Sequence, residues 1–306
     1  MPTLKQLSYL VAIADEGHFG RAAARARIAQ PTLSAQLARL EDTLGGRLVD
    51  RARTTVALTP LGQEVAARAR RALAEVQGIV DLAQASRGGL GGTLRLGVPP
   101  TLGPYLLPFV VPALHARYPR LKLHVREGKP HEIQDQLARG RFDLLLTPLP
   151  IVTPHLDVAP LFREPLMAAV VPDHPLARRG RIRRRDLRGE SVLTLESGHY
   201  LHNQVRDLCL ETGATILNDY DGTSLDTLRH MVGMGVGMAF FPALYVLSEI
   251  RDRSEIAVLD MEGGTLFREI GLAWRSGNAL HGHYRALADL ITAEAGRHPG
   301  PPWVTP

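Results

Sequence analysis

The sequence predicts an α/β protein in which one long helix joins a small N-terminal helical domain to a two-lobed α/β domain. Up to about Asp50 the apolar residues recur mainly at helical spacing, and one helical stripe then runs from Thr59 to about Ser86. After Thr93, short apolar strands alternate with helices, which predicts a mainly parallel sheet. The 306 residues suggest roughly two domains. The expected boundaries are 1–58 for the helical domain, 59–87 for the long helix, 88–92 for a hinge and 93–298 for the α/β domain.

The stretch from Gly20 to Asp50 indicates two short helices separated by a tight turn, which is the pattern of a helix-turn-helix. The second helix has a single apolar stripe, formed by Leu33, Leu37, Leu40 and Leu44. Pro31 suits the first turn of this helix and Gly45 suits its end. The opposite face carries small or basic side chains that can approach a rigid partner such as DNA: Thr32, Ala35, Ala38 and Arg39.

Two further elements complete the predicted N-terminal domain. A first helix runs from Leu4 to Ala14 and is broken by Gly17. After the helix-turn-helix, the alternation around Val56 and Leu58 fits a short hairpin, or wing. The domain is therefore predicted to be a winged helix-turn-helix.

Candidate DNA-binding residues follow from this placement. The start of the second helix is the end that enters the major groove in such motifs. There, Gln30 can bond adenine bidentately and Thr32 can offer its hydroxyl or methyl group to a base edge, with Pro31 between them. Phosphate contacts are expected from Ser34, Arg39, Arg51 and Arg53. The alternative for each arginine is an ordinary solvated surface charge.

The charge distribution favours the same region as the nucleic-acid interface. Residues 1–90 contain 12 Arg and Lys against 8 Asp and Glu, a net charge of +4. The remaining residues contain 24 against 23, a net charge of +1, so that the basic excess lies mainly in the N-terminal part.

The long helix is predicted to mediate dimerisation. Thr59-Pro60 is a helix-start signal, and the apolar stripe that follows has nearly heptad spacing. The other faces are expected to be solvated, because they carry Arg68, Arg70, Arg71 and Glu75. The alternative is a helix packed only on its own domain. Four glycines in the five residues 88–92 indicate the hinge.

The α/β domain has too many predicted strands for one small sheet. Two lobes joined by crossing strands account for them, as in periplasmic-binding proteins. Lobe I is expected at about 93–162 plus 268–298, and lobe II at about 163–267. Among the predicted strands are Leu166–Val171 and Leu266–Trp274.

Several function classes find no support in the sequence. It has no Walker loop, zinc signature or nucleophile elbow, so neither an enzyme nor a cofactor or metal site is expected. The single cysteine, Cys209, excludes an intramolecular disulfide. We expect a cytoplasmic protein without membrane contact, because no signal peptide is evident and no apolar run reaches ~18 residues. A solute-binding protein remains a remote alternative, disfavoured by the missing signal peptide.

The N-terminal 60 residues resemble LysR-type transcriptional regulators, and the α/β domain resembles the peroxide-sensing OxyR branch of that family. The first resemblance rests on Phe19 to Ala23, Gln30 to Ser34, Leu37 to Glu41, Leu48 to Arg51 and Leu58 to Gly62, with Val49 where phenylalanine is usual. The second rests on Gly103 to Pro108, Glu164 to Leu166, Asp173 to Pro175, Gly198-His199, Thr223 to Leu225, Thr227 to Arg229 and Pro242 to Leu244. The resemblance implies a homodimer or homotetramer that binds promoter operators in double-stranded DNA. It also implies control of oxidative-stress genes in response to hydrogen peroxide, with RNA polymerase as a further partner.

The chain departs from that branch at its reactive centre. The peroxide-reactive cysteine of the branch follows the Gly-His pair, where this chain has Tyr200, while the partner cysteine is present as Cys209. A threonine that helps to bind peroxide is replaced by Pro130, and a second is retained as Thr101. The hypothesis is a one-cysteine sensor, in which Arg206 stabilises the Cys209 thiolate and peroxide converts it to sulfenic acid. The alternative is an inert core thiol.

A competing input is a small effector, such as a carboxylate, in the cleft between the lobes. Ligands of such sheets bind at loops that follow the strands and at helix N-termini. The candidate residues on these loops and helix starts are Thr101, Lys129, His131, Thr147, His199, Asn203 and Ser224.

Overall fold

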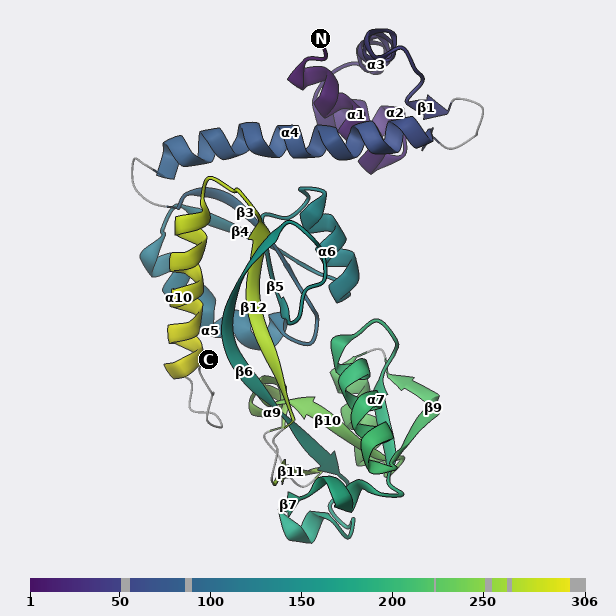
Figure 1. The fold of residues 1–306 in the computed structure, drawn as a ribbon, viewed down its shortest axis with the longest axis vertical. Coiled ribbons are helices and arrows are strands. Elements are labelled where there is room, and N and C mark those ends of the chain that lie inside the picture. The colour runs from purple at the N-terminus through teal and green to yellow at the C-terminus, as the bar shows by residue number, and fades with distance from the viewer. Residues whose placement is uncertain (51–55, 86–89, 223, 251–254, 263–265, 298–306) are drawn as a thin grey trace. The chain divides into compact units, whose positions relative to one another are not determined.

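The computed structural model describes residues 1–50, 56–85, 90–222, 224–250, 255–262 and 266–297 (Figure 1). The predicted Arg51 and Arg53 therefore lie outside the described residues. The chain divides into two compact units. The first contains residues 1–88 with the short segments 139–141 and 278–280, and the second contains the rest.

The first unit begins with three helices and a small hairpin. The helices are α1 (Leu4–Glu16), α2 (Phe19–Ala26) and α3 (Gln30–Leu44), and the hairpin pairs β1 (Val49–Asp50) antiparallel with β2 (Ala57–Leu58). Helices α1 and α3 end at Gly17 and Gly45, whose φ values of 57° and 70° are left-handed. These elements match the predicted winged helix-turn-helix.

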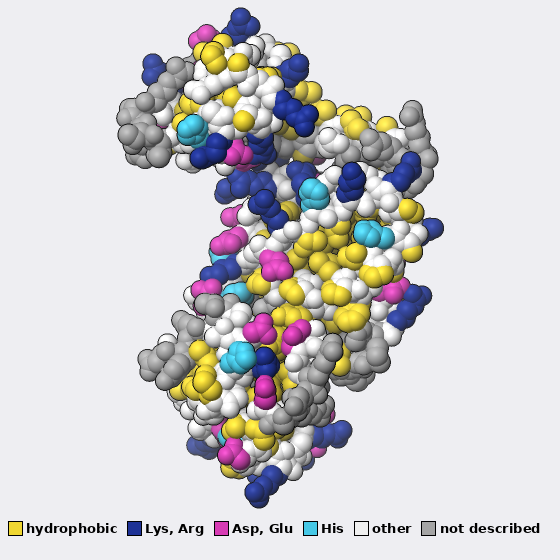
Figure 2. Space-filling view, turned by 180° about the vertical axis from the view of Figure 1, so that it is seen from behind, with side chains coloured by type: hydrophobic (Ala, Val, Ile, Leu, Met, Phe, Trp, Pro, Cys, Tyr) yellow, Lys and Arg dark blue, Asp and Glu magenta, His cyan; other side chains and the backbone are white. Residues whose placement is uncertain are grey.

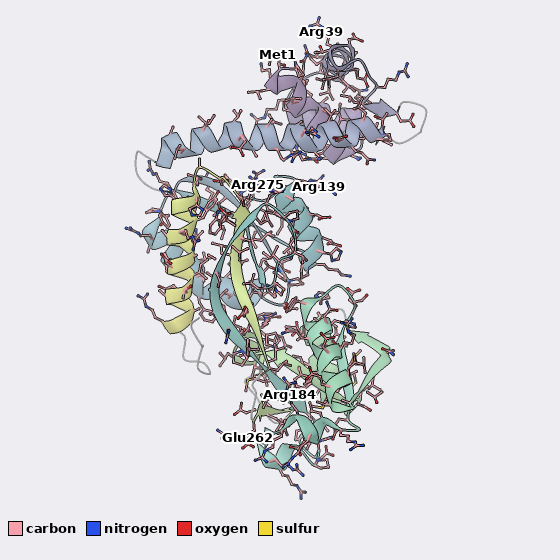
Figure 3. All side chains as sticks on the ribbon, viewed as in Figure 1. Met1, Arg39, Arg139, Arg184, Glu262 and Arg275 are labelled. Atoms are coloured by element: carbon pink, nitrogen blue, oxygen red, sulfur yellow. The ribbon has the colours of Figure 1, made fainter. Side chains whose placement is uncertain are left out.

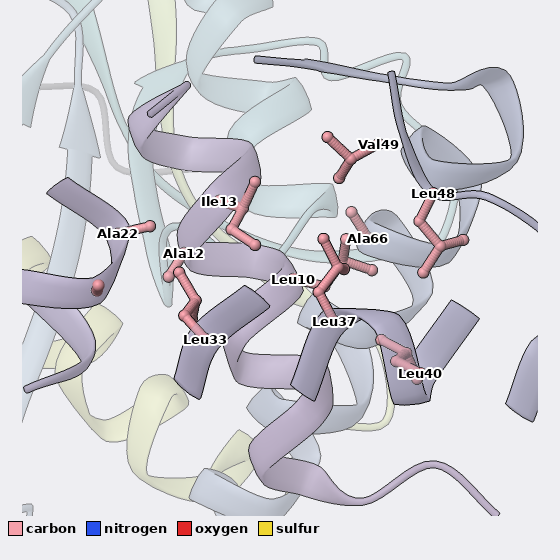
Figure 4. Packing of buried hydrophobic residues seen from close by; sticks show 11 residues of the cluster. Leu10, Ala12, Ile13, Ala22, Leu33, Leu37, Leu40, Leu48, Val49 and Ala66 are labelled. Carbon is pink, nitrogen blue, oxygen red and sulfur yellow. The ribbon is translucent and has the colours of Figure 1, made fainter. Parts of the chain in front are cut away.

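Three leucines of the predicted apolar stripe of α3 form the centre of a small core, whereas the fourth, Leu44, is 39% exposed. Leu33, Leu37 and Leu40 are at most 1% exposed and pack with Leu10 of α1 and with Val49 (Figure 4). Val49 is 1% exposed and is thus a core side chain, as expected. A fourth helix, α4 (Pro60–Ala85), contributes to the same core.

The second unit contains two lobes built on parallel strands. In lobe I, β3 (Gly92–Val98) lies between parallel β4 (Leu121–Glu127) and β5 (Leu144–Pro148). In lobe II, β8 (Ser191–Leu195) lies between parallel β9 (Thr215–Gly222) and β10 (Met238–Pro242). The helices of lobe I are α5 (Gly103–Arg117), α6 (Pro130–Ala138) and α10 (His281–Arg297), and those of lobe II are α7 (Tyr200–Thr212), α8 (Leu225–Gly233) and α9 (Ala243–Glu249).

Two long antiparallel strands cross from one lobe to the other. They are β6 (Leu156–Val170) and β12 (Phe267–Arg275), and Figure 1 shows them running side by side through the unit. β12 also pairs antiparallel with β5, and β6 with β10. A short strand β11 (Ala257–Met261) pairs with β6 and with β7 (Arg181–Ile182). The predicted crossing strands are confirmed, but the expectation of a mainly parallel sheet is wrong at these antiparallel pairs.

The first part of β6, before Leu166, was not predicted, because a strand was expected only at Leu166–Val171. Pro160 and Pro165 interrupt the segment, and proline is a weak strand signal because it has no N–H to donate. The strand tolerates both prolines, with a register shift against β12 at Ile270 and Gly271. The α/β fold class with a helix-turn-helix head is confirmed.

Candidate nucleic-acid interface and regulatory site

Helix α3 separates its residues into a buried face and an outer face. Leu33 and Leu37 point into the core, whereas Gln30, Pro31, Thr32 and Arg39 are exposed, and Ser34 is half-buried. Arg39 lies on α3 in the stick view (Figure 3). The N-cap residue Ala29 provides no side-chain cap, so the first N–H groups of α3 are available to an acceptor such as phosphate. Gln30, Pro31, Thr32 and Arg39 thus lie at exposed positions of α3, outside its buried face.

The start of α2 lies beside the start of α3, and a glycine separates them. The His18 ring accepts hydrogen bonds from the N–H groups of Gly20, at 2.9 Å, and of Arg21, at 3.4 Å, which caps α2. A Cβ atom at Gly20 would lie 3.0 Å from the His18 ring and 3.5 Å from Oε1 of Gln30. Glycine at this position therefore leaves room for the cap and for the Gln30 side chain.

In the second unit, a buried ion pair joins the two lobes. Arg268 of β12 is 1% exposed and Glu164 of β6 is fully buried. The Arg268 Nε donates to Glu164 Oε2 at 2.8 Å, and its Nη1 and Nη2 donate to the hydroxyl and carbonyl oxygens of Thr101 at 3.0 and 2.7 Å. The other Glu164 oxygen accepts from the N–H of Leu244 in α9 at 2.9 Å. Both charges are thus paired and hydrogen-bonded, as burial requires.

Sequence reasoning found Thr101 but missed both Arg268 and Glu164 as site residues. The sequence signal at these positions is a pair of adjacent opposite charges in each strand, Arg163-Glu164 in β6 and Arg268-Glu269 in β12. Thr101 lies at the junction of the lobes, where its hydroxyl and carbonyl oxygens both accept hydrogen bonds from Arg268.

A second contact between the lobes is half-exposed. Lys129 of lobe I lies 3.0 Å from Oε1 of Glu196 in lobe II, with 31% and 37% of the two side chains exposed. His199 lies beside this pair, with its Nε2 3.9 Å from the same glutamate oxygen. A Cβ at Gly198 would lie 3.4 Å from Lys129 and 3.5 Å from His131. The structure therefore brings Lys129, His131 and His199 together.

His199, the buried histidine of this cluster, is held in its neutral form. His199 is 4% exposed. Burial lowers its pKa below the ordinary value, and the nearby Lys129 and His202 lower it further, against the opposing charge of Glu196.

The remaining candidate effector residues are placed differently. Thr147 is fully buried in β5, and its hydroxyl lies 3.5 Å from the carbonyl oxygen of Pro148. Asn203 is exposed on α7. The Ser224 hydroxyl caps α8 by accepting from the N–H of Thr227 at 3.2 Å. Each of these residues thus has a local structural role or an exposed position, rather than a contact with Lys129.

The structure gives Cys209 the environment of a core thiol. It lies on α7 and is 4% exposed, and burial raises its pKa to about 11. Arg206 does not serve it, because its guanidinium is exposed and pairs with Asp207 at 2.9 Å. Burial raises the pKa of Tyr200 as well, with smaller effects from Glu269 and Asp207. Both groups therefore stay protonated at neutral pH, which makes the Cys209 sulfur a poor nucleophile.

Comparison with known proteins decides the family. Residues 4–63 match the model of bacterial regulatory helix-turn-helix proteins of the lysR family, and residues 87–296 match the LysR substrate binding domain. The chain belongs to the LysR family. Its helix-turn-helix is that of a DNA-binding transcription regulator, and its two lobes form the regulatory domain.

Similar LysR-family proteins have been characterised. The DNA-binding transcriptional dual regulator OxyR of Escherichia coli K12 is 38% identical over 295 residues, covering 96% of each chain. The hydrogen peroxide-inducible genes activator of Haemophilus influenzae is 35% identical over 291 residues, covering 95% of this chain and 96% of that one. Among solved structures, a full-length OxyR variant from Pseudomonas aeruginosa superposes with a TM-score of 0.81 at 36% identity, covering 94% of each chain. A hydrogen peroxide-bound OxyR variant from Corynebacterium glutamicum gives 0.66 at 30% identity, covering 96% and 93%.

Two absences hold for the residues that the structure describes. None of their helices combines the length and the hydrophobicity of a membrane span. The same described residues also contain no group of three or more histidine, cysteine or carboxylate side chains placed to hold a metal ion.

Proposed function

We propose that this LysR-family regulator controls peroxide-response genes by binding operator DNA as a homodimer or homotetramer, with its signal entering at the lobe junction. The outer face of α3 carries the proposal for DNA binding, because Gln30, Thr32 and Arg39 are exposed there over a well-packed core. The peroxide-response role is supported by the names of its relatives. We place the protein in the cytoplasm, where its DNA target lies, with RNA polymerase as a proposed further partner.

The exposed surface of α4 supports the dimer. Val76 and Ile79, in its second half and on the predicted apolar stripe, are 37% and 67% exposed. Figure 2 shows hydrophobic side chains on the part of this helix that extends beyond the helical head. An apolar stripe at nearly heptad spacing is covered when two such helices pack together. We propose residues 59–87 as the dimerisation helix, between the DNA-binding domain at 1–58 and the regulatory domain at 93–298.

Substitutions on α3 test the DNA-binding proposal. We expect Gln30→Ala to weaken binding to a promoter fragment by about 1–3 kcal/mol and to relax its sequence preference, because it removes a contact to a base edge. Arg39→Ala is expected to weaken binding to all sequences alike and to reduce the salt dependence of the affinity by about one phosphate contact. Fluorescence anisotropy with promoter and scrambled duplexes, over a series of salt concentrations, measures both effects.

The control is Arg68→Ala, which removes an exposed positive charge on α4, outside the proposed DNA-binding face. This variant should bind like the wild type. Unchanged affinity in both α3 variants would contradict the placement of the interface on α3.

For the input, the half-exposed Lys129–Glu196 pair favours a small anionic effector over oxidation of Cys209. Arg268 is already neutralised by Glu164 in the core, whereas Lys129 is held by a carboxylate that solvent can reach. A small anion can therefore replace Glu196 at Lys129, beside His131 and His199, without uncovering a buried charge. An anion that replaces Glu196 breaks this ion pair between the lobes. The lobes can then change their relative orientation, which is how the effector would alter DNA binding.

Glu196→Gln tests this input, because it removes the competing carboxylate. We expect acetate, succinate or phosphate to raise the thermal stability of Glu196→Gln at lower concentration than that of the wild type, and Lys129→Met to abolish the shift. Ligand at 100 times its Kd stabilises a protein by about 2.7 kcal/mol. Equal shifts in the wild type and Lys129→Met would contradict the site.

A different outcome would favour the redox route. Hydrogen peroxide that changes the DNA footprint of the wild type but not of Cys209→Ser would assign the signal to the thiol instead of to Lys129.

A further inference from the structure

Asp15 ties the helix-turn-helix to α4 through a partly buried ion pair. It lies in the last turn of α1, and its Oδ1 is 2.7 Å from Nη2 of Arg70 in α4. Its Oδ2 is 3.3 Å from Nη1 of Arg25 in α2. The side chains of Asp15 and Arg70 are only 17% and 11% exposed. One carboxylate therefore links three helices of the first unit.

The electrostatics show that the carboxylate is held in its charged form. Nη2 of Arg141 also lies 2.7 Å from Oδ1 of Asp15. Burial raises the pKa of Asp15, but the hydrogen bond and charge of Arg70 and the charges of Arg141 and Arg25 outweigh this effect and lower the pKa below its ordinary value. On the other side of the pair, Nε of Arg70 is buried without a hydrogen-bond partner among the described residues. A buried guanidinium in this position depends on its carboxylate partner.

A second attachment lies at the start of α4. A Cβ atom at Gly62 would lie 1.9 Å from the carbonyl oxygen of Leu48, so only glycine allows the helix to approach the chain before β1 so closely. The Thr59 hydroxyl donates to the carbonyl oxygen of Arg47 at 2.7 Å, next to this contact. Arg70 follows Gly62 by about 12 Å along the helix, at 1.5 Å per residue. Attachment at two separated points fixes the rotation of the helix-turn-helix on α4.

We infer that the Asp15–Arg70 ion pair is a positioning device that sets the distance between the two DNA-reading helices of a dimer. This inference rests on the proposed function, in which α4 pairs with its copy and α3 reads DNA. Helix α3 packs on α1 through Leu10, Leu33 and Leu37, so the orientation of α1 on α4 is passed on to α3. Release of the ion pair leaves each α3 intact but frees its angle relative to α4.

The experiment compares DNA duplexes that carry one half-site or two half-sites, the latter with spacing varied in single base-pair steps. The half-site is taken from a footprint of the wild-type protein on its own promoter. Asp15→Asn keeps the shape of the side chain and removes its charge. We expect single-half-site affinity to stay within about twofold of wild type, and affinity at the best two-site spacing to fall by at least about tenfold, because simultaneous engagement is lost. The preference for one spacing should flatten.

Two further variants separate positioning from general stability. Glu64→Gln removes the exposed Glu64–Arg68 pair on the same helix and should keep the wild-type spacing profile. Asp15→Glu restores the charge and should recover part of the spacing preference. Thermal unfolding of each variant shows whether the domain is folded.

Each outcome is decisive. A wild-type spacing profile in Asp15→Asn overturns the inference. Equal losses on single and double half-sites also overturn it, because the pair would then hold the helix-turn-helix together rather than orient it. Absence of specific binding by the wild type to any duplex would instead contradict the proposed function.

Discussion

Replacement of Arg268 by methionine is expected to destabilise the regulatory domain by about 3–5 kcal/mol, the cost of removing one partner from a buried ion pair. The substitution leaves the Glu164 carboxylate fully buried, with the Leu244 N–H as its one remaining hydrogen-bond donor among the described residues. It also removes the two hydrogen bonds that the Arg268 guanidinium donates to Thr101 of lobe I. Urea unfolding monitored by circular dichroism measures the loss as a lower midpoint.

The chain offers a matched control on the adjacent positions of the same strands. Arg163 and Glu269 form an ion pair at 2.9 Å, but their side chains are 41% and 44% exposed. Arg163→Met should therefore cost no more than about 1 kcal/mol, the usual value of a solvent-screened pair.

The double variant Glu164→Leu, Arg268→Met removes both charges together. Its loss should be smaller than that of Arg268→Met, because no unpaired charge stays buried. A single variant as stable as Arg163→Met would contradict the view that the lobes are held by a buried charge.

How much could be predicted from the sequence depended on how local the signal was. The core face of α3 followed from leucines at spacings of three and four, and the ends of the helix from Pro31 and Gly45, because helix periodicity and caps lie within a few residues. The DNA-binding residues proposed on the exposed part of α3 stay a prediction.

Long-range pairings were beyond this kind of reasoning. Arg70 was interpreted as part of a solvated face, because nothing within its own helix indicates that Asp15, 55 positions earlier, covers it. Glu164 and Arg268 are 104 positions apart, and their partnership exists only because β6 and β12 pair in this register. Charged residues inside strands are expected to face solvent unless a partner is known. The sites that sequence reasoning missed are therefore those made by opposite charges brought together by the fold.

The surroundings of Cys209 do not support the hypothesis that it senses peroxide. The sequence hypothesis required a cation beside Cys209, and Arg206 was the candidate because it precedes the cysteine by one helical turn. The structure directs that guanidinium to Asp207 and leaves the thiol among apolar side chains, where burial alone raises its pKa. A sensor thiol needs the opposite environment, with a low pKa and access to solvent.

Alkylation kinetics should therefore show an unreactive thiol. With a pKa of about 11 instead of 9.0, the thiolate fraction at neutral pH is about 100-fold smaller, and the rate of reaction with iodoacetamide should fall by at least that factor relative to an unfolded control. The rate should rise about tenfold per pH unit up to about pH 11, because the thiolate is the nucleophile. Mass spectrometry of samples quenched at intervals, in buffer and in urea, gives both rates.

Rapid labelling of the folded protein at pH 7 would contradict this environment for Cys209 and restore the one-cysteine sensor. Slow labelling in buffer, with fast labelling in urea, would show that folding itself lowers the reactivity of the Cys209 thiol. In that case an oxidant could reach Cys209 only through opening of the α7 region, and the lobe junction at Lys129 would remain the input that the folded protein presents to solvent.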